Sequence, residues 1–197
     1  WTLRGAHWAE VGHTLQATAA GMPVRSASMV IFIVVLLLMR RRIDAALLRT
    51  KRKIHRISTD RFAYTWEATF WTVLLAIPVP LGLGFVAWIF TQDPEASGWM
   101  RGIAQGSQIA AWITLAMGMM LAICCEGGLG AVHFGWGEEP LHRCRRAIIW
   151  FTAVFIPAFL VTCGTVYGEG SHYFGSVGRI SLMGAHAWAA VILWWLF

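Results

Sequence analysis

The chain has 197 residues, of which 57% are hydrophobic and 13% are charged, and its formal net charge is +6. Water-soluble domains carry about 25% charged residues, so this composition excludes an ordinary soluble domain and favours lipid as the main solvent. The positive excess is concentrated in one segment that lacks interleaved aromatic residues. That pattern favours contact with anionic lipids and argues against a nucleic-acid-binding protein.

The first 22 residues have mixed polarity, and we expect an extracytoplasmic lead-in over residues 1–22 that holds a short interfacial helix. The first membrane span is expected over residues 23–40. Its charge-free part, Ser26–Met39, is shorter than the roughly 17 residues that usually cross a bilayer. Arg25 and Arg40 flank this part, and their long side chains can reach the headgroups from either end.

Four further apolar stretches complete a transmembrane helical region over residues 23–197. They are expected at residues 68–92, 102–125, 147–168 and 180–197. Pro78 and Pro80 lie in the middle of the second span, and Pro157 lies near the centre of the fourth. Proline removes a backbone donor and clashes with the preceding turn, so we predict helix kinks at these prolines. The predicted fold class is all-α, a polytopic helical membrane protein with about five transmembrane helices.

Basic residues crowd the connection between the first two spans, which we expect to be a cytoplasmic loop over residues 40–67. We expect lipid headgroups to be contacted by Arg40, Arg41, Arg42, Arg49, Lys51, Arg52 and Lys53. With five alternating spans, the N-terminus then lies outside, and the second basic connection, residues 126–146, lies inside. Three tryptophans are expected near the membrane–water interfaces, namely Trp99, Trp136 and Trp150.

Small residues recur at intervals of four along the third span. The series is Gly102, Gly106, Ala110, Thr114, Gly118 and Ala122. In a helix, residues four apart lie on one face, and small side chains there let a second backbone approach closely. Chance in a helix rich in alanine and glycine is the alternative explanation. We favour close helix–helix packing along this face, which is a structural prediction and carries no function by itself.

Candidate groups for chemistry are few. Cysteine and histidine side chains gather in or beside the inner connection, at Cys124, Cys125, His133, His142 and Cys144. Their spacing does not match the pairs that zinc sites use, so we expect reduced cysteines and no metal. His186 lies inside the fifth span without a charged partner, and we favour a neutral histidine that hydrogen-bonds across a helix interface. No catalytic constellation or phosphate loop is recognisable, so we expect no enzyme and no cofactor.

Two stretches carry the motifs that are most specific. The first, Ile57–Phe90, starts with Thr59-Asp60-Arg61-Phe62 and continues with Thr65, Glu67, Pro78-x-Pro80 and a Trp88-bearing helix. The second, Gly127–Leu160, holds Gly127–Gly130, His133-Phe134, Trp136, Arg143–Arg146 and Pro157. Together they resemble the membrane region of large mechanosensitive channels, the multi-span relatives of the small-conductance (MscS) type, in particular the potassium-dependent kind. Cys124-Cys125 departs from that pattern, and the segment after Gly164 matches only in hydrophobicity.

The resemblance implies a bacterial inner-membrane, multi-pass protein that assembles as a heptameric homo-oligomer with membrane lipids as partners. In such channels the last span lines the pore and leads into a β-rich cytoplasmic vestibule, and neither is recognisable here. Since the chain opens on Trp1 and stops within an apolar run at Phe197, we expect a fragment that comprises the peripheral, tension-sensing helices of a mechanosensitive ion channel. Two alternatives remain open, part of a secondary transporter and a structural membrane-anchor region.

Overall fold

The computed structural model describes residues 5–54, 62–92, 96–125, 127–132, 134–169 and 177–196. The regular structure in these residues is helical throughout. The elements are α1 (Gly5–Gly21), α2 (Pro23–Ile54), α3 (Phe62–Ala76), α4 (Pro78–Thr91), α5 (Gly98–Ile123), α6 (Leu129–Val132), α7 (Glu138–Glu169) and α8 (Val177–Leu196). The prediction of an all-α fold is confirmed.

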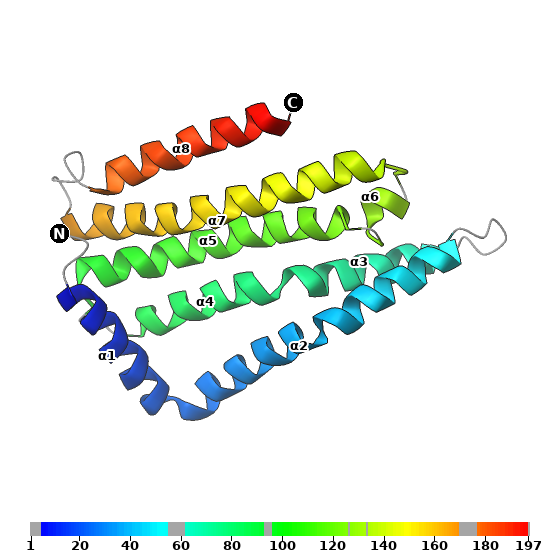
Figure 1. Cartoon of the computed structure of the whole chain (residues 1–197). Helices are drawn as coiled ribbons and strands as arrows, with labels where there is room; N and C mark the ends of the chain where they lie inside the picture. The colour runs from blue at the N-terminus through cyan, green and yellow to red at the C-terminus, as the bar shows by residue number, and fades with distance from the viewer. Residues whose placement is uncertain are drawn as a thin grey trace.

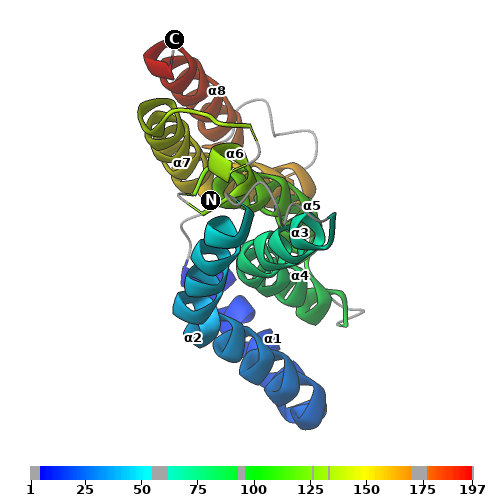
Figure 2. The ribbon, with the colours of Figure 1, turned by 90° about the vertical axis from the view of Figure 1, so that its right-hand side faces the viewer.

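The long helices form a row that is one helix thick (Figure 1, Figure 2). In this row α8 packs on α7, α7 on α5, α5 on α3 and α4, and α2 on α3. Successive long helices run in opposite directions. The C-terminal ends of α2, α5 and α8 and the N-terminal ends of α3 and α7 therefore lie on the same side of the layer (Figure 1). On the opposite side, Val11 and Leu15 of α1 pack against a buried cluster that includes Ile89, Phe90 and Met100.

Four of the helices are long and apolar enough to cross a membrane, and the α3–α4 pair makes a fifth span if the two helices count as one. This agrees with the five predicted spans. In the apolar 18-residue stretch of α2 and in that of α8, only 11% of the residues are buried within the described structure. The corresponding shares are 33% in α5 and 28% in α7. The row therefore centres on α5 and α7, and its outer helices leave most of their apolar surface uncovered.

Helix α2 continues well beyond the first expected span. It ends at Ile54, and α3 begins at Phe62, so the described part of the loop expected over residues 40–67 is helical at both ends. Arginine, leucine, alanine and lysine dominate this extension, and all are strong helix formers. Ile43 and Leu47 are both only 1% exposed, and their spacing of four residues places them on one face of the helix. This buried face, within a highly charged segment, explains why the extension is helix and not loop.

Helix α7 runs without interruption through Pro157, whose side chain is exposed. A kink at this residue stays a prediction. The outermost helix, α8, is tied to α7 by side chains that donate to backbone carbonyls: Thr162 Oγ1 to Gly178 (3.1 Å), Ser181 Oγ to Ala158 (3.0 Å) and Trp188 Nε1 to Trp150 (3.1 Å). In lipid, bonds of this kind help to hold helices together because hydrophobic burial contributes little.

Candidate functional site

The second span is broken between α3 and α4. The segment Trp66–Ala76 and helix α4 meet at an angle of 46°. Ile77 occupies the break and remains hydrogen-bonded to both helices. Its amide donates to the carbonyl of Val73 (3.2 Å), and its carbonyl accepts from the amide of Leu81 (3.0 Å). The two helices thus stay joined while the span changes direction.

Pro78 and Pro80 account for the break. Neither residue has an amide hydrogen, so neither can donate to the carbonyl four residues earlier, at Leu74 and Ala76. In a membrane, a carbonyl freed in this way must be covered by a neighbouring helix. Gly118 of α5 covers Ala76, because a Cβ atom placed on Gly118 would lie only 3.2 Å from the Ala76 carbonyl oxygen. Gly118 belongs to the small-residue stripe, the series of small side chains that recur at intervals of four along α5. A residue of this stripe therefore meets the proline break.

Gly102 and Gly106, at the other end of the stripe, pack against α7. A Cβ on Gly102 would lie 2.8 Å from the Cα of Gly164 and would also overlap the carbonyl of Cys163. A Cβ on Gly106 would lie 2.8 Å from the Cβ of Cys163. Gly164 in turn makes room for Trp99, which is only 5% exposed. Trp99 thus lies inside the α5–α7 contact, at the start of α5, and its expected place near a membrane interface stays a prediction.

The stripe serves two contacts, not one. Residues four apart on a helix are rotated by about 40°, so Gly118 lies about 160° around α5 from Gly102. Gly102 accordingly meets α7, whereas Gly118 meets α3. Between and beyond them, Ala110, Thr114 and Ala122 are all buried. The small residues wind around α5 as its central place in the row requires.

A glycine turn after α5 packs against the helical extension of α2. A Cβ on Gly127 would lie 3.1 Å from the backbone carbon of Leu47. A Cβ on Gly130 would lie 3.0 Å from the ring of Trp136. Gly135 has a φ of 62°, in the left-handed region that glycine adopts without strain. The glycine motif of the sequence therefore joins α2 to the C-terminal end of α5.

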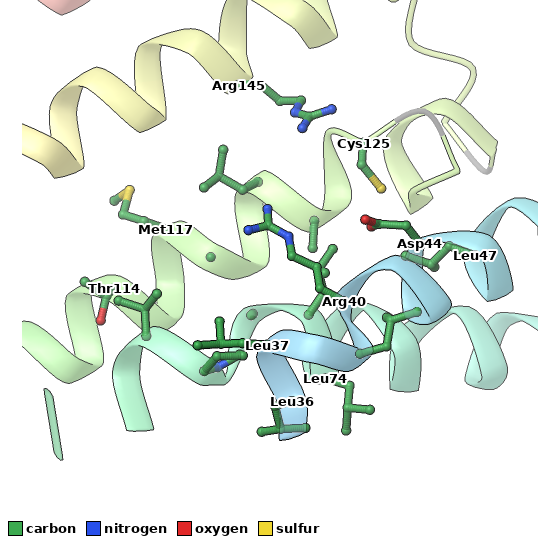
Figure 3. A pocket seen from close by; sticks show the side chains of 18 of the residues that line it. Leu36, Leu37, Arg40, Asp44, Leu47, Leu74, Thr114, Met117, Cys125 and Arg145 are labelled. Atoms are coloured by element: carbon green, nitrogen blue, oxygen red, sulfur yellow. The ribbon is translucent and has the colours of Figure 1, made fainter. Parts of the chain in front are cut away.

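A cavity of about 610 Å³ lies where α2, the α3–α4 break, α5 and α7 meet (Figure 3). Its wall is largely apolar and includes Leu36, Leu74, Val79, Met117 and Leu121. Arg40, Asp44 and Arg145 also line it, and Figure 3 shows these side chains coming from α2 and α7. Pro78 and Gly118 belong to the same wall. The break and the cavity are therefore parts of one site.

The cysteine thiols near the cavity are protonated at neutral pH. Burial and, next, the neighbouring Cys144 raise the pKa of the Cys124 thiol to about 11, and burial raises the pKa of Cys125 as well. Protonated thiols are poor ligands and poor nucleophiles. Within the described residues, no three His, Cys, Asp or Glu side chains are placed to hold a metal ion. His133 lies outside those residues.

The described basic side chains that follow the first apolar run of α2 are all exposed, namely Arg40, Arg41, Arg42 and Arg49. Arg40 also lines the cavity. The side chains of Lys51, Arg52 and Lys53 lie outside the described part of the structure. Their contact with headgroups stays a prediction for the whole set.

His186 does not bridge two helices. Its Nδ1 lies 2.8 Å from the carbonyl of Leu182, one turn earlier on the same helix, and the side chain is exposed. The expected bond across a helix interface is wrong, because α8 is the outermost helix of the row and His186 lies on an uncovered face.

A row of apolar helices with a proline-broken span and no catalytic constellation among its described residues defines a polytopic helical membrane domain. A family model described as "Mechanosensitive ion channel inner membrane domain 1" matches residues 23–197. The chain belongs to this family of MscS-type mechanosensitive channels. It is a multi-pass inner-membrane domain of a channel family and not an enzyme.

One characterised relative is the miniconductance mechanosensitive channel MscM of Escherichia coli (strain K12). The two sequences are 26% identical over 148 residues, which is 72% of this chain and 13% of that protein. The chain thus spans only a small part of its relative's length. No solved structure matches. The predicted family is confirmed, but this match does not single out the potassium-dependent kind.

Proposed function

We propose that this region senses membrane tension for a mechanosensitive ion channel, as the helices that lie in lipid outside the pore. The α3–α4 break is the observation that carries the proposal. It is a bend of 46° that remains hydrogen-bonded through Ile77, and it borders a cavity of about 610 Å³. A bend beside open space can change its angle with little repacking, which is what a hinge requires.

Tension acts on this region through membrane area. It favours the conformation that occupies more area, as a ligand favours the state that it binds more tightly. The glycine contacts of Gly102 and Gly164 leave α5 and α7 little room to slide. A change in area is then taken up at the break between α3 and α4. The basic end of α2 holds that end of the row to anionic headgroups, at about 1 kcal/mol for each nearby Lys or Arg.

The finer parts of the proposal concern orientation and assembly. The basic segment of α2 and the basic start of α7 lie on the same side of the helix layer (Figure 1). This supports a cytoplasmic location for that side and an N-terminus outside. On the resemblance, the parent protein assembles as a heptameric homo-oligomer, with the pore helix and the vestibule outside this chain. Potassium dependence rests on the resemblance alone, and exchanging potassium for sodium during recording tests it.

Patch-clamp recording of the full-length parent in lipid vesicles tests the tension-sensing role. We expect currents that open above a threshold tension. Gly118→Val should shift the threshold, because its methyl groups meet Ala76 at the break. Gly84→Val is the matched control, since a Cβ at Gly84 has no heavy atom within 4 Å. Currents that are absent or independent of tension would sink the proposal, and equal thresholds for the two variants would remove the break from the mechanism.

A secondary transporter is the rival function. Transporters place polar groups and backbone ends beside a broken helix, near the middle of the membrane. The residues that flank this break along the chain are apolar, as at Leu74, Leu75 and Val79, and the charged residues of the cavity come from α2 and α7. The family match also favours a channel. If the region is only a structural anchor, no substitution at the break should change the tension threshold of the channel.

A further inference from the structure

One face of α5 stays uncovered by the other described helices, and it is polar. Its exposed residues follow a helical spacing, at Gln105, Gln108, Ile109, Trp112 and Ala116. The Trp112 side chain is 65% exposed, and its indole nitrogen forms no hydrogen bond among the described residues. Polar side chains within a membrane span normally face other protein groups, because lipid tails offer no hydrogen bonds. This face therefore needs a polar partner.

Contacts with α7 place Trp112 inside the hydrocarbon. Gly106 packs on Leu160 and Cys163 of α7, which runs antiparallel to α5. Both helices rise by about 1.5 Å per residue, so Trp112 lies level with roughly residues 154–157 of α7. These residues belong to the charge-free run of α7 that begins at Ala147. The indole is thus well below the level of the headgroups.

His186 is a second polar group on an uncovered face, and it lies at nearly the same depth. Side chains of α8 on either side of it bond to the Ala158 and Trp150 carbonyls of α7. His186 therefore lies level with roughly residues 152–153 of α7, also within the charge-free run. The depths of His186 and Trp112 differ by about one helical turn. Two ring side chains can bridge that separation.

The two side chains are complementary as donor and acceptor. In the part of the chain that the structure describes, His186 bonds through Nδ1, which lies 2.8 Å from the Leu182 carbonyl of its own helix. A carbonyl can only accept, so Nδ1 carries the proton and Nε2 of the neutral ring is left as an acceptor. The indole N–H of Trp112 is only a donor. Each residue thus offers the group that the other lacks.

The two residues cannot meet within one copy, because α7 separates α5 from α8 in the row (Figure 1). Copies of one chain in a membrane share one orientation, so groups that are level in one copy are also level between neighbouring copies. A contact between α8 of one copy and α5 of the next joins two different surfaces. Contacts of this kind close into rings when the rotation permits. The geometry is therefore compatible with a cyclic oligomer.

We propose that the exposed face of α5 binds α8 of a second copy of this chain, with the Trp112 indole donating to His186 Nε2 across the contact. Small exposed residues lie one turn away from each group, Ala116 on α5 and Ala190 on α8, and let the two helices approach closely. Gln108, one turn from Trp112 in the other direction, brings a further donor and acceptor to the contact. The inference rests on the homo-oligomer of the proposed function and adds the surfaces through which the copies meet.

Disulfide crosslinking in membranes tests the contact, in the full-length parent with its native cysteines replaced. One tagged copy carries Ala116→Cys, a differently tagged copy carries Ala190→Cys, and the two are coexpressed. Both positions are exposed and lie one turn from the proposed bond toward the same side of the membrane. Oxidation with copper phenanthroline should therefore link the two tags in one heterodimer. Either copy expressed alone should give no dimer.

Conservative variants test the bond itself. Trp112→Phe removes the donor and keeps an aromatic ring, and His186→Phe removes the acceptor. Each should lower the heterodimer yield about three-fold, the ratio that a bond of about 0.6 kcal/mol between membrane helices gives. The double variant should lower the yield no further, because either change alone removes the bond. Trp195→Phe is the matched control, since this exposed residue lies on the opposite side of α8 from His186, and it should leave the yield unchanged.

Three results would overturn the proposal. Equal yields from Trp112→Phe and Trp195→Phe would show that the indole donor plays no part. Dimers of the Ala116→Cys copy alone would mean that α5 faces α5 of the second copy. An absent heterodimer would mean that another helix of the longer protein covers α5.

The oligomeric state and the currents separate this contact from the proposed function. Native mass spectrometry of the parent gives the oligomeric state. An oligomer without the heterodimer removes this contact alone, whereas a monomeric parent removes the contact and the homo-oligomer together. A heterodimer without tension-gated currents leaves the contact standing and removes the sensing role.

Discussion

At the residue scale, the lack of a Cβ atom decides where two helices touch. Gly102 and Gly164 bring the backbones of α5 and α7 together, and Gly118 reaches the break. Gly82 and Gly84 are also glycines in a membrane helix, yet nothing lies within 4 Å of a Cβ placed on either. Spacing alone does not separate these two kinds of glycine, because the difference lies in which neighbour each one faces.

Gly102→Ala should destabilise the domain. The added methyl meets the backbone of Cys163 and Gly164, which cannot rotate away, so the free energy of unfolding should fall by about 1–3 kcal/mol. Thermal unfolding followed by circular dichroism in detergent measures the loss. Gly84→Ala is the control and should be neutral or stabilising by up to about 1 kcal/mol, since alanine favours helix. Equal melting temperatures for the two variants would contradict the close α5–α7 contact.

The Cys124 thiol should resist alkylation at neutral and mildly alkaline pH. Burial and the neighbouring Cys144 raise its pKa to about 11, so the reactive thiolate forms only as the pH approaches that value. Alkylation by iodoacetamide between pH 7 and 11, read by peptide mass spectrometry, gives the profile. The midpoint should lie well above the value of about 8.5 for a free cysteine. A midpoint near that of free cysteine would show that the thiol is not buried.

At the element scale, the position of a proline decides whether a helix breaks. Pro78 and Pro80 together remove two donors within one turn, and the span bends by 46° there. Pro157 stands alone inside α7, and the helix continues through it. The freed carbonyl of Ala76 also has a neighbour, Gly118, that comes close enough to cover it. A break therefore depends on a pair of prolines and on the helix that faces them.

Replacing both Pro78 and Pro80 by alanine should straighten the second span, because the restored amides can donate to Leu74 and Ala76. Spin labels at Phe70 and Thr91, in a background without native cysteines, should then move apart by about 2 Å, given the helical rise of about 1.5 Å per residue. Double electron–electron resonance measures the change. Pro157→Ala with the same labels should leave the distance unchanged. An unchanged distance in the double variant would mean that packing on α5, not proline, sets the bend.

Thr162→Val together with Ser181→Ala should loosen α8. The change removes the bonds from Thr162 to Gly178 and from Ser181 to Ala158, and polar bonds between membrane helices contribute about 0.6 kcal/mol each on average. The melting temperature should fall modestly. Hydrogen exchange along α8 should rise while that of α5 stays constant. Thr152→Val is the control, because that hydroxyl donates within α7 to Ile148. Equal effects of the two changes would argue against the role of these bonds.

At the scale of the whole molecule, the row arrangement separates rigid from adaptable parts. Helices α5 and α7 form its middle, and 33% and 28% of the residues in their apolar stretches are buried. Helices α2 and α8 form its exposed edges. Such a row presents two broad faces. It is suited to lying in lipid or against further helices, and the cavity beside α2 lies where the row is bent.

Reporter fusions test the proposed orientation. Green fluorescent protein fused after residues 56 and 136 should fluoresce, because the positive-inside rule places these basic connections in the cytoplasm. Alkaline phosphatase should be active after residues 94 and 173, on the opposite side. The reverse pattern would invert the domain, and a mixture of both patterns would mean that the α3–α4 pair does not cross the membrane as one bent span.

Much of the fold follows from local pattern. Long apolar stretches placed α5, α7 and α8 close to their observed bounds, since a bilayer requires such lengths. The charge run after Arg40 predicts a loop, because charged residues favour solvent, whereas the buried pair Ile43 and Leu47 gives this segment a packed helix face. Within the site, the sequence marks Pro78 as a helix breaker and Gly118 as one of the small residues spaced by four. Their contact, and the roles of Arg145 and Gly164, depend on helices that are distant in sequence.

The sequence by itself determined that this chain is an all-helical membrane domain. Hydrophobicity, length and charge clustering are local properties, and they decide whether a segment forms a helix that is stable in a bilayer. The tertiary structure decided which glycines pack, how far α2 extends and where the cavity lies. It also showed that the four-residue stripe winds around α5, so that Gly102 meets α7 and Gly118 meets the break. These are matters of which faces meet in space, and residues four apart on a helix acquire a partner only when a second helix is placed beside them.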